Sequence, residues 1–353
     1  MGATWDAMQP AIAGLKSAAD EADAKIADLQ EDNADLRAQN ADLQAALDEC
    51  EAGHPPDPEP PTTGFGPHLE PPDGFIYIGC SVPSGDWSGW IGEVGKTPHI
   101  WHEYATSGST FVSDLNNCPR GCIPLINFKP TGSMGLNAYN AILRGDGDGA
   151  IDQAASAIKS YGRQMFLAPL HEPENDDSGG GDDEYARAFR YIIERVRARG
   201  ADNAVSVWNM MGYYGHGSRY NTLYPGDDVV DWIGSDPYVR TDAKVDTWAE
   251  LFNTASGSFP GFYSWAKPKG KPFMLCEWGI GQPVAATVAP KLLGNDQLTA
   301  LQASFPLCRA LVYWNHEGEA DYRVHESDWP GQTMRDFVAK APFVFDVSSV
   351  AKP

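Results

Sequence analysis

Two glutamates that each end an apolar run are the residues of this chain best placed to do chemistry. Glu172 follows Met165–Leu170 and a histidine, and Glu277 follows Pro272–Leu275 and a cysteine. A short apolar run that ends abruptly in a polar residue predicts a buried strand whose carboxyl end faces a cavity. In a parallel barrel, these strand ends carry the catalytic residues. Two carboxyl groups so placed suit cleavage of a glycosidic bond, which needs a proton donor and a nucleophile or base.

The stretch from about residue 74 to 346 alternates apolar runs with helical patterns. Eight runs are candidate strands: Phe75–Gly79, His99–Glu103, Ile123–Phe128, Gln164–Leu170, Ala204–Trp208, Val230–Ser235, Pro272–Cys276 and Ala310–Trp314. Helical patterns lie between several of them, for example at Ala150–Tyr161 and Asp183–Arg199. Eight strands with intervening helices over about 270 residues predict an α/β protein, a (β/α)8 TIM barrel.

The order of five short motifs along this stretch resembles glycoside hydrolase family 26. In chain order the motifs are His171-Glu172, Trp208-Asn209, Asp231 to Tyr238, Glu277-Trp278-Gly279 and Trp314. The resemblance implies a retaining glycosidase with a (β/α)8 fold and catalytic glutamates on the fourth and seventh strands. It implies that Glu172 is the general acid/base and that Glu277 is the nucleophile.

The local sequence agrees with these two roles. A general acid needs an apolar setting that raises its pKa, and Glu172 follows an apolar run. A nucleophile must be ionised and needs hydrogen-bond donors, for which Tyr238 is the candidate beside Glu277. If both strands belong to one barrel, their carboxyl groups approach to about 5 Å, which predicts retention of anomeric configuration. Taken alone, either glutamate is as readily a strand-tip residue in a structural salt bridge.

Further polar and aromatic residues are candidates for substrate binding. His171 would orient the acid or the sugar. Asp236 lies two residues before Tyr238 and so faces the same way along a strand, where it would bind substrate, hold His171 or cap the next turn. Glu174 is expected on a loop, as a subsite or solvent residue. Flat rings stack on sugars, so the remaining candidates are Trp314 under the cleaved sugar, then Trp208 with Asn209, Trp278 and Trp101. Core packing is the alternative for each tryptophan.

Composition excludes several other classes of function. The formal net charge of −22, from 48 acidic and 26 basic residues, argues against nucleic-acid binding and against adhesion to anionic membranes. No apolar stretch reaches the roughly 20 residues of a membrane span. Neither a phosphate-cradling glycine loop nor a Cys/His ligand set occurs, so no organic cofactor and no metal are predicted. Cys118 and Cys122 either close a small loop in an oxidising setting or stay free thiols.

A heptad pattern over residues 12–50 predicts a coiled coil. One set of positions is Ile12, Ala19, Ile26, Asn33, Asn40 and Leu47, and the other is Leu15, Ala22, Leu29, Leu36, Leu43 and Cys50. Asn33 and Asn40 fix register and strand number, which leaves a homo-dimer or a homo-trimer open. A lone amphipathic helix packed on the main domain is the alternative. The predicted organisation is a coiled-coil helix over 1–52, a Pro-rich linker over 53–73, the barrel over 74–346 and a tail over 347–353.

The leading hypothesis is an endo-glycosidase of a polysaccharide, displayed on an oligomeric stalk that raises avidity for a repetitive polymer. No Sec-type signal peptide is visible, which predicts a virion-associated phage tail enzyme that degrades host-surface glycan. A secreted bacterial polysaccharidase is the alternative. Two other classes are a non-catalytic carbohydrate-binding, receptor-binding barrel and a structural tail component. Ala168 and the residues 173–177 depart from the family pattern, which leaves the sugar and linkage open between mannan and another polymer such as cell-wall arabinogalactan.

Overall fold

The computed structural model describes residues 65–83, 87–132, 137–175, 179–240, 245–294, 296–324 and 331–353, with Lys16 and Lys25. The chain divides into Met1–Pro60 and Pro61–Pro353, and the second unit contains the barrel. Apart from Lys16 and Lys25, the predicted coiled coil and the first part of the predicted linker lie outside the described residues. No helix in the described ranges is long and apolar enough to cross a membrane.

Eight parallel strands form a closed barrel, as the sequence predicts. They are β1 (Tyr77–Ser81), β2 (Ile100–Ala105), β3 (Ile123–Phe128), β4 (Met165–Pro169), β5 (Ala204–Met210), β6 (Trp232–Ser235), β8 (Phe273–Ile280) and β9 (Cys308–Trp314). Each strand pairs with the next, β1 pairs with β9, and the pairing of β6 with β8 completes the ring. A ninth short strand, β7 (Tyr238–Val239), pairs with the carboxyl-terminal end of β8.

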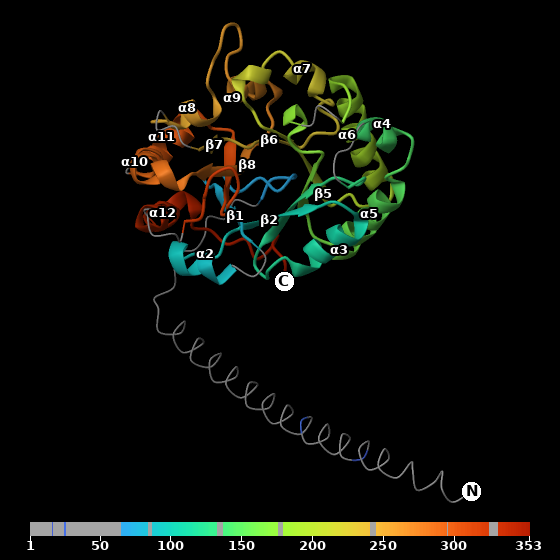
Figure 1. Ribbon diagram of the computed structural model, residues 1–353. Helices are drawn as coiled ribbons and strands as arrows, with labels where there is room; N and C mark the ends of the chain where they lie inside the picture. The colour runs from blue at the N-terminus through green and yellow to red at the C-terminus, as the bar shows by residue number, and fades with distance from the viewer. Residues whose placement is uncertain are drawn as a thin grey trace, which may run out of the picture. The chain divides into compact units, whose positions relative to one another are not determined.

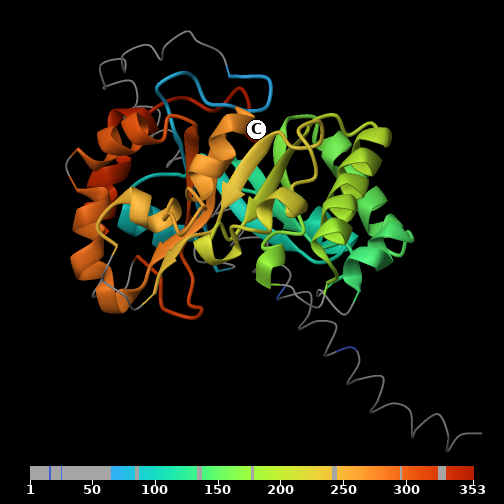
Figure 2. The same cartoon turned by 90° about the horizontal axis from the view of Figure 1, so that it is seen from above.

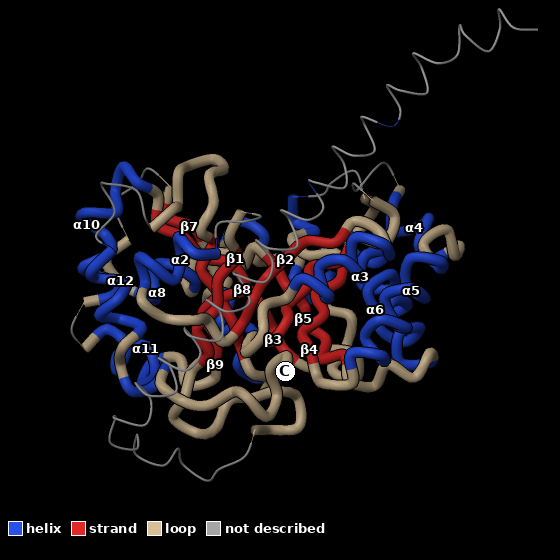
Figure 3. The backbone as a smooth tube through the Cα atoms, turned by 90° about the horizontal axis from the view of Figure 1, so that it is seen from below, coloured by secondary structure: helices blue, strands red, loops and turns tan. Residues whose placement is uncertain are grey.

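Helices follow the strands and cover the outside of the barrel. They are α2 (Trp87–Val94), α3 (Gly108–Asn117), α4 (Ala138–Leu143), α5 (Asp148–Tyr161), α6 (Asp182–Ala198), α7 (Tyr220–Leu223), α8 (Trp248–Phe252), α9 (Phe262–Ala266), α10 (Gln282–Leu293), α11 (Gln297–Ser304) and α12 (Gly331–Val338). Figure 1 shows these helices around the strands, and their colours follow the chain around the ring. Figures 2 and 3 show the strands in the middle with helices outside them.

The apolar side chains divide into two layers because successive residues of a strand face opposite sides. The inner layer takes alternate residues from all eight barrel strands, such as Val205 and Val207 of β5. The outer layer takes the intervening residues, such as Trp208 and Met210, and packs them under the helices. A parallel sheet covered on both faces explains why its strands appear in the sequence as continuous apolar runs.

Strand β8 departs from this alternation at one point. Between Leu275 and Trp278 the strand gains one residue relative to β9, where the matching positions are Leu311 and Tyr313. Such a bulge changes the face on which the following side chains lie. Cys276 belongs to the inner layer and Trp278 to the outer layer, so the residue between them is free to turn into the barrel.

The barrel unit is longer at both ends than the predicted range of 74–346. Leu69 is fully buried in the inner layer, and Trp232 donates a hydrogen bond from its indole Nε1 to the carbonyl of His68. At the other end, Val347 and Ala351 pack into the same layer. The predicted boundary at residue 74 and the predicted tail at 347–353 are therefore wrong, because both segments close the amino-terminal end of the barrel.

We predict that Leu69→Ala lowers the free energy of unfolding of the barrel by about 2–5 kcal/mol, the usual cost of a Leu-to-Ala cavity in a core. Urea unfolding followed by tryptophan fluorescence measures this change. The control is Asp73→Ala, because this side chain is 98% exposed, and its cost should stay within about 0.5 kcal/mol. Equal stabilities of the two variants would show that residues 65–73 are a linker.

Candidate active site

A cleft of about 830 Å³ opens at the carboxyl-terminal end of the barrel. Both predicted catalytic glutamates line it. The cleft is also lined by Asp236, Tyr238, Trp314 and Tyr322 and by the segment Met211–Tyr214. The structure thus brings together side chains that follow β4, β5 and β6 with others from β8 and β9. A cavity of this size with convergent polar groups is the usual form of a ligand site.

Glu277 accepts hydrogen bonds from three side chains on different strands. Tyr238 donates its hydroxyl to Oε2 at 2.5 Å, and Tyr104 donates its hydroxyl to Oε1. Asn127 donates from Nδ2 to the same Oε1 at 3.2 Å. Glu277 is only 5% exposed, so these donors replace the water that its carboxyl loses. The predicted donor Tyr238 is in the predicted place.

The protonation states around Glu277 follow from burial. Burial raises the pKa of Glu277 to about 8, whereas the three donors favour its ionised form. Burial also raises the pKa of Tyr238 well above its ordinary value of 10, so its hydroxyl stays a donor. His102 lies 3.9 Å from Oε1 of Glu277, and burial lowers its pKa to about 3. The imidazole is therefore neutral and brings no compensating charge.

Glu172 occupies an unusual stretch of backbone just after β4. Leu170 and Glu172 have positive φ angles of 52° and 50°, which residues other than glycine rarely adopt. The Glu172 amide donates to the carbonyl of Asn209 at 3.1 Å, and Asn175 donates from Nδ2 to Glu172 Oε2 at 3.3 Å. Such left-handed residues are concentrated at functional sites, where the surrounding structure holds them.

Two further carboxyl groups lie behind Glu172. Asp236 accepts a hydrogen bond at 2.7 Å from Nδ2 of Asn209, and burial together with the charge of Glu172 raises the pKa of Asp236 well above its ordinary value. Burial raises the pKa of Glu174 to about 7, and the charge of Glu172 adds to this effect. Asp236 and Glu174 are therefore both biased toward their protonated forms beside Glu172.

Glu174 is buried, although the sequence predicts it on a solvent-exposed loop. Its side chain accepts hydrogen bonds from the amides of Met211 at 3.2 Å and Gly212 at 3.4 Å. It lies on the short 3-10 turn Pro173–Asn175, where Arg219 donates to its carbonyl. The prediction is wrong because the chain turns inward at the left-handed Glu172 instead of leaving the barrel.

Trp314 lines the cleft at the end of β9. His316 stacks on its ring with centroids 4.0 Å apart, and Tyr104 meets its ring edge-on at 5.5 Å. The Tyr104 ring also meets His171 edge-on at 5.0 Å. His171 is buried and does not line the cleft, and its Nδ1 has no hydrogen-bond partner among the described residues.

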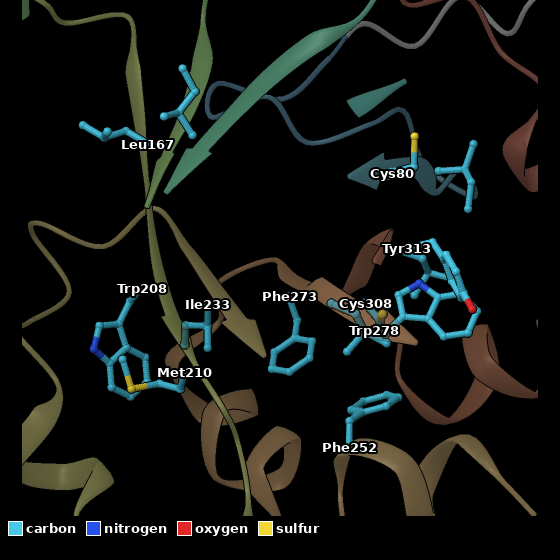
Figure 4. Close-up of a cluster of buried hydrophobic side chains, with 14 of the residues drawn as sticks. Cys80, Leu167, Trp208, Met210, Ile233, Phe252, Phe273, Trp278, Cys308 and Tyr313 are labelled. Atoms are coloured by element: carbon cyan, nitrogen blue, oxygen red, sulfur yellow. The ribbon is translucent and has the colours of Figure 1, made fainter. Parts of the chain in front are cut away.

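Two predicted sugar-binding tryptophans belong to the hydrophobic core instead. Trp208 is fully buried under the helices and packs on Tyr224 and Trp265 with centroids 5.1 and 5.6 Å away. Trp278 is also fully buried and meets Tyr313 at 4.9 Å. Figure 4 shows Trp208 beside Met210 and Trp278 beside Tyr313 in this cluster. Both are predicted wrongly, because strand alternation and the β8 bulge turn them outward.

Trp101 is likewise wrong as a substrate-binding residue. Its neighbours on β2, Ile100 and His102, face into the barrel, so Trp101 faces outward and packs with Cys118 and Cys122. Both cysteines are free thiols in the structure, and no disulfide joins them there. Burial raises the pKa of each thiol, so they behave as small apolar groups and not as nucleophiles.

Sequence reasoning missed several residues of the site. Tyr104 and Asn127 bind Glu277 directly, yet each lies one residue before the end of a strand without a motif around it. A polar residue near the end of an otherwise apolar run was the available signal for Asn127. Tyr213 and Tyr214 line the cleft after β5, in a stretch whose loop conformation the sequence does not specify.

The chain is similar in sequence to known glycoside hydrolases. No family model matches the chain. Over 219 residues the chain is 27% identical to Endoglucanase H of Acetivibrio thermocellus, a match that covers 59% of this chain and 23% of that protein. It is 26% identical over 218 residues to the β-1,3-xylanase of a Vibrio species, covering 58% of this chain and 45% of that one. The matched region thus spans less than half the length of either relative.

The solved structure of another protein has the same fold as this barrel. A family 26 β-mannanase from Bacteroides ovatus superposes with a TM-score of 0.55 at 13% identity, over 79% of this chain and 92% of that chain. The predicted barrel is confirmed, and the predicted resemblance to glycoside hydrolase family 26 is supported at the level of the fold. The relatives and the structural neighbour are all glycoside hydrolases by name.

The hydrogen bond from Tyr238 to Glu277 generates a prediction about pH. The predicted role of Glu277 as nucleophile requires an ionised carboxylate. The value of kcat/KM should therefore fall as the pH drops through the pKa of Glu277, between its ordinary 4.5 and about 8. Tyr238→Phe removes a donor to the carboxylate and should move this acidic limb to higher pH. It should also lower the plateau about 10- to 100-fold, because a hydrogen bond to a charged group contributes about 1.5–3 kcal/mol.

The matched control is Tyr191→Phe, which removes a tyrosine-to-carboxylate hydrogen bond of 2.6 Å to Asp148 on the outer helices. Its pH profile should coincide with that of the wild type. An acidic limb that stays in place in Tyr238→Phe would contradict the assignment of Glu277 to that limb.

Proposed function

We propose that the barrel is a retaining endo-glycosidase of a β-linked polysaccharide, with Glu277 as nucleophile and Glu172 as general acid/base. The observation that carries this proposal is the different surroundings of two carboxyl groups in one cleft. Glu277 is buried and held by three donors, while Glu172 lies on the rim with its side chain partly exposed. A nucleophile needs fixed donors, and an acid/base needs access to the bond and to water.

In the first step, Oε of Glu277 attacks the anomeric carbon of the sugar that keeps its place in the barrel. Glu172 gives its proton to the glycosidic oxygen as the bond to the leaving chain breaks, and a glycosyl ester forms on Glu277. Tyr238 and Tyr104 orient the attacking carboxylate, and Trp314 offers a flat face under the reacting sugar. His171 packs edge-on against the ring of Tyr104 and helps to position this tyrosine beside Glu277.

In the second step, Glu172 takes a proton from a water molecule that attacks the same anomeric carbon. The ester bond breaks and Glu277 leaves as a carboxylate, which its three donors stabilise again. Two inversions give net retention of configuration. Glu172 and Glu277 line the same cavity, as this double displacement requires.

The names of the similar proteins suggest the substrate class. They name an endoglucanase, a β-1,3-xylanase and a β-mannanase, and two of these names specify a β linkage. A polysaccharide with a β-linked backbone is therefore the substrate that we propose. The panel that identifies it contains mixed-linkage β-glucan, β-1,3-xylan, β-1,4-mannan and cell-wall arabinogalactan, with reducing-end release as the readout.

Azide rescue tests the two catalytic roles. Both Glu172→Ala and Glu277→Ala should lose reducing-end release from the polymer that the wild type cleaves. With an activated dinitrophenyl glycoside of that sugar, azide should restore turnover of Glu172→Ala and give a glycosyl azide of retained configuration. With Glu277→Ala, azide attacks in place of the nucleophile and should give the inverted product.

Glu194→Ala serves as a control, since it removes a carboxyl group that is 57% exposed on the outer helix α6 and does not line the cleft, and it should keep polymer cleavage. Activity that survives the loss of either Glu172 or Glu277 would refute the proposal. Binding of a polymer from the panel without turnover by the wild type would support the carbohydrate-binding alternative.

The heptads of residues 12–50 support a second part of the proposal, a homo-oligomeric stalk that presents several barrels to one polymer. Sedimentation equilibrium of the full chain should give two or three times the chain mass of 38.3 kDa. The double variant Leu29→Asp with Leu36→Asp places charges in the seam and should sediment as a monomer.

The double variant Ala34→Asp with Ala41→Asp adds the same charges outside the seam and should keep the wild-type mass. A wild-type chain that sediments at 38.3 kDa would rule out the stalk.

A further inference from the structure

Two adjacent tyrosines after β5 have exposed rings to which the mechanism described above gives no role. Tyr213 is 49% exposed and Tyr214 is 38% exposed, and with Val344 they are the large apolar side chains exposed in the described residues. Their ring centroids are 4.2 Å apart. Both rings line the cleft that holds Glu172 and Glu277. Exposed aromatic rings that share a cavity with reacting groups mark a binding surface.

The backbone that carries these rings is held from three sides. Glu174 accepts from the amides of Met211 and Gly212, and Tyr220 donates its hydroxyl to the carbonyl of Tyr213 at 2.8 Å. Gly212 has a positive φ of 70°, and a Cβ there would meet Ser235 Oγ at 2.5 Å. A ring on a fixed backbone loses little conformational entropy when a ligand stacks on it.

The buried Glu174 is the residue that joins this segment to the loop of Glu172. It lies two residues beyond Glu172 on the turn Pro173–Asn175, and its carboxyl reaches across to the amides after β5. The Glu172 amide makes a parallel connection to the carbonyl of Asn209 on β5. The tyrosines are thereby fixed relative to Glu172, while Glu277 is held from β2, β3 and β7.

Because Glu172 and Glu277 are held by different segments, the residues around each glutamate can be assigned to one side of the cleaved bond. Glu277 attacks the anomeric carbon, so the residues around it face the sugar that stays on the enzyme. Glu172 protonates the oxygen of the departing chain, so the surface fixed to the loop of Glu172 faces that chain. We propose that Tyr213 and Tyr214, positioned by Glu174, form the subsite that binds the pyranose on the leaving-group side of the cleaved bond. This inference rests on the proposed glycosidase function.

The subsite determines which bond is cleaved and how well a sugar acceptor competes with water. Each ring offers an apolar face to the C–H face of a pyranose and a hydroxyl to its edge. By microscopic reversibility, an acceptor sugar that attacks the glycosyl ester occupies the place that the leaving chain has vacated. Transfer to an acceptor should therefore need the same two tyrosines.

The test compares two substrates that differ in what occupies the leaving-group side. One is whichever polymer of the panel the wild type cleaves, and the other is the β-glycosyl fluoride of the matching disaccharide, whose leaving group is a single atom. Tyr213→Ala and Tyr214→Ala should each lower kcat/KM on the polymer about tenfold, given the energies of aromatic contacts. Hydrolysis of the fluoride should keep its wild-type kcat/KM.

Two further variants separate recognition from folding. Glu174→Gln replaces one of the two accepting oxygens with an amide N–H donor, which then opposes the backbone amide of Met211 or of Gly212. It should reproduce the loss on the polymer through misplaced tyrosines, while its melting profile shows that the barrel remains folded. Val344→Ala removes the other exposed large apolar side chain and should behave as the wild type on both substrates. With the fluoride as donor and the matching disaccharide as acceptor, both tyrosine variants should form less transfer product.

An equal loss on polymer and fluoride would overturn the proposal and place the tyrosines on the side of the retained sugar. Unchanged polymer cleavage in both tyrosine variants would also overturn it. Failure of the proposed function has a different signature, since the wild type would then hydrolyse neither the polymers nor the fluorides.

Discussion

The site depends on a carboxylate buried inside a barrel whose own strands supply the donors that hold it. Glu277 has lost almost all its water, and Tyr104, Asn127 and Tyr238 replace it from β2, β3 and β7. These strands are distant in sequence and meet only because the parallel ring closes through β6 and β8. Closure of the barrel and preorganisation of Glu277, the proposed nucleophile, are therefore one structural event.

The bulge in β8 is what points that carboxylate inward. Met274 and Cys276 already face the barrel interior, so strict alternation would send Glu277 outward and Trp278 inward. One extra residue between Leu275 and Trp278 reverses this order. Glu172 reaches the same cleft by a different route, through a left-handed backbone just beyond β4. Each of the two carboxyl groups thus depends on a local departure from regular strand geometry.

Much of the fold could be predicted from the sequence, and part of the site could not. The barrel strands are covered on both faces, so each leaves a continuous apolar run, and the predicted strand Ile123–Phe128 matches β3 to the residue. Glu172, Glu277, Asp236, Tyr238 and Trp314 lie at the cleft because polar residues end such runs. The bulge, the inward turn of Glu174 and the donors Tyr104 and Asn127 depend on register between distant strands, which one strand's sequence does not record. Trp208 and Trp101 were misassigned although the alternation of their own strands places both outside the barrel.

The most direct test of the central claim is to trap the covalent intermediate. The full chain would be incubated with dinitrophenyl 2-deoxy-2-fluoro-β-glycosides of the gluco, manno and xylo series, then digested and mapped by mass spectrometry. The account predicts one added sugar per chain, carried by the peptide that contains Glu277, and no adduct in Glu277→Ala. An adduct on a different residue, or release of an inverted product with no adduct, would contradict it.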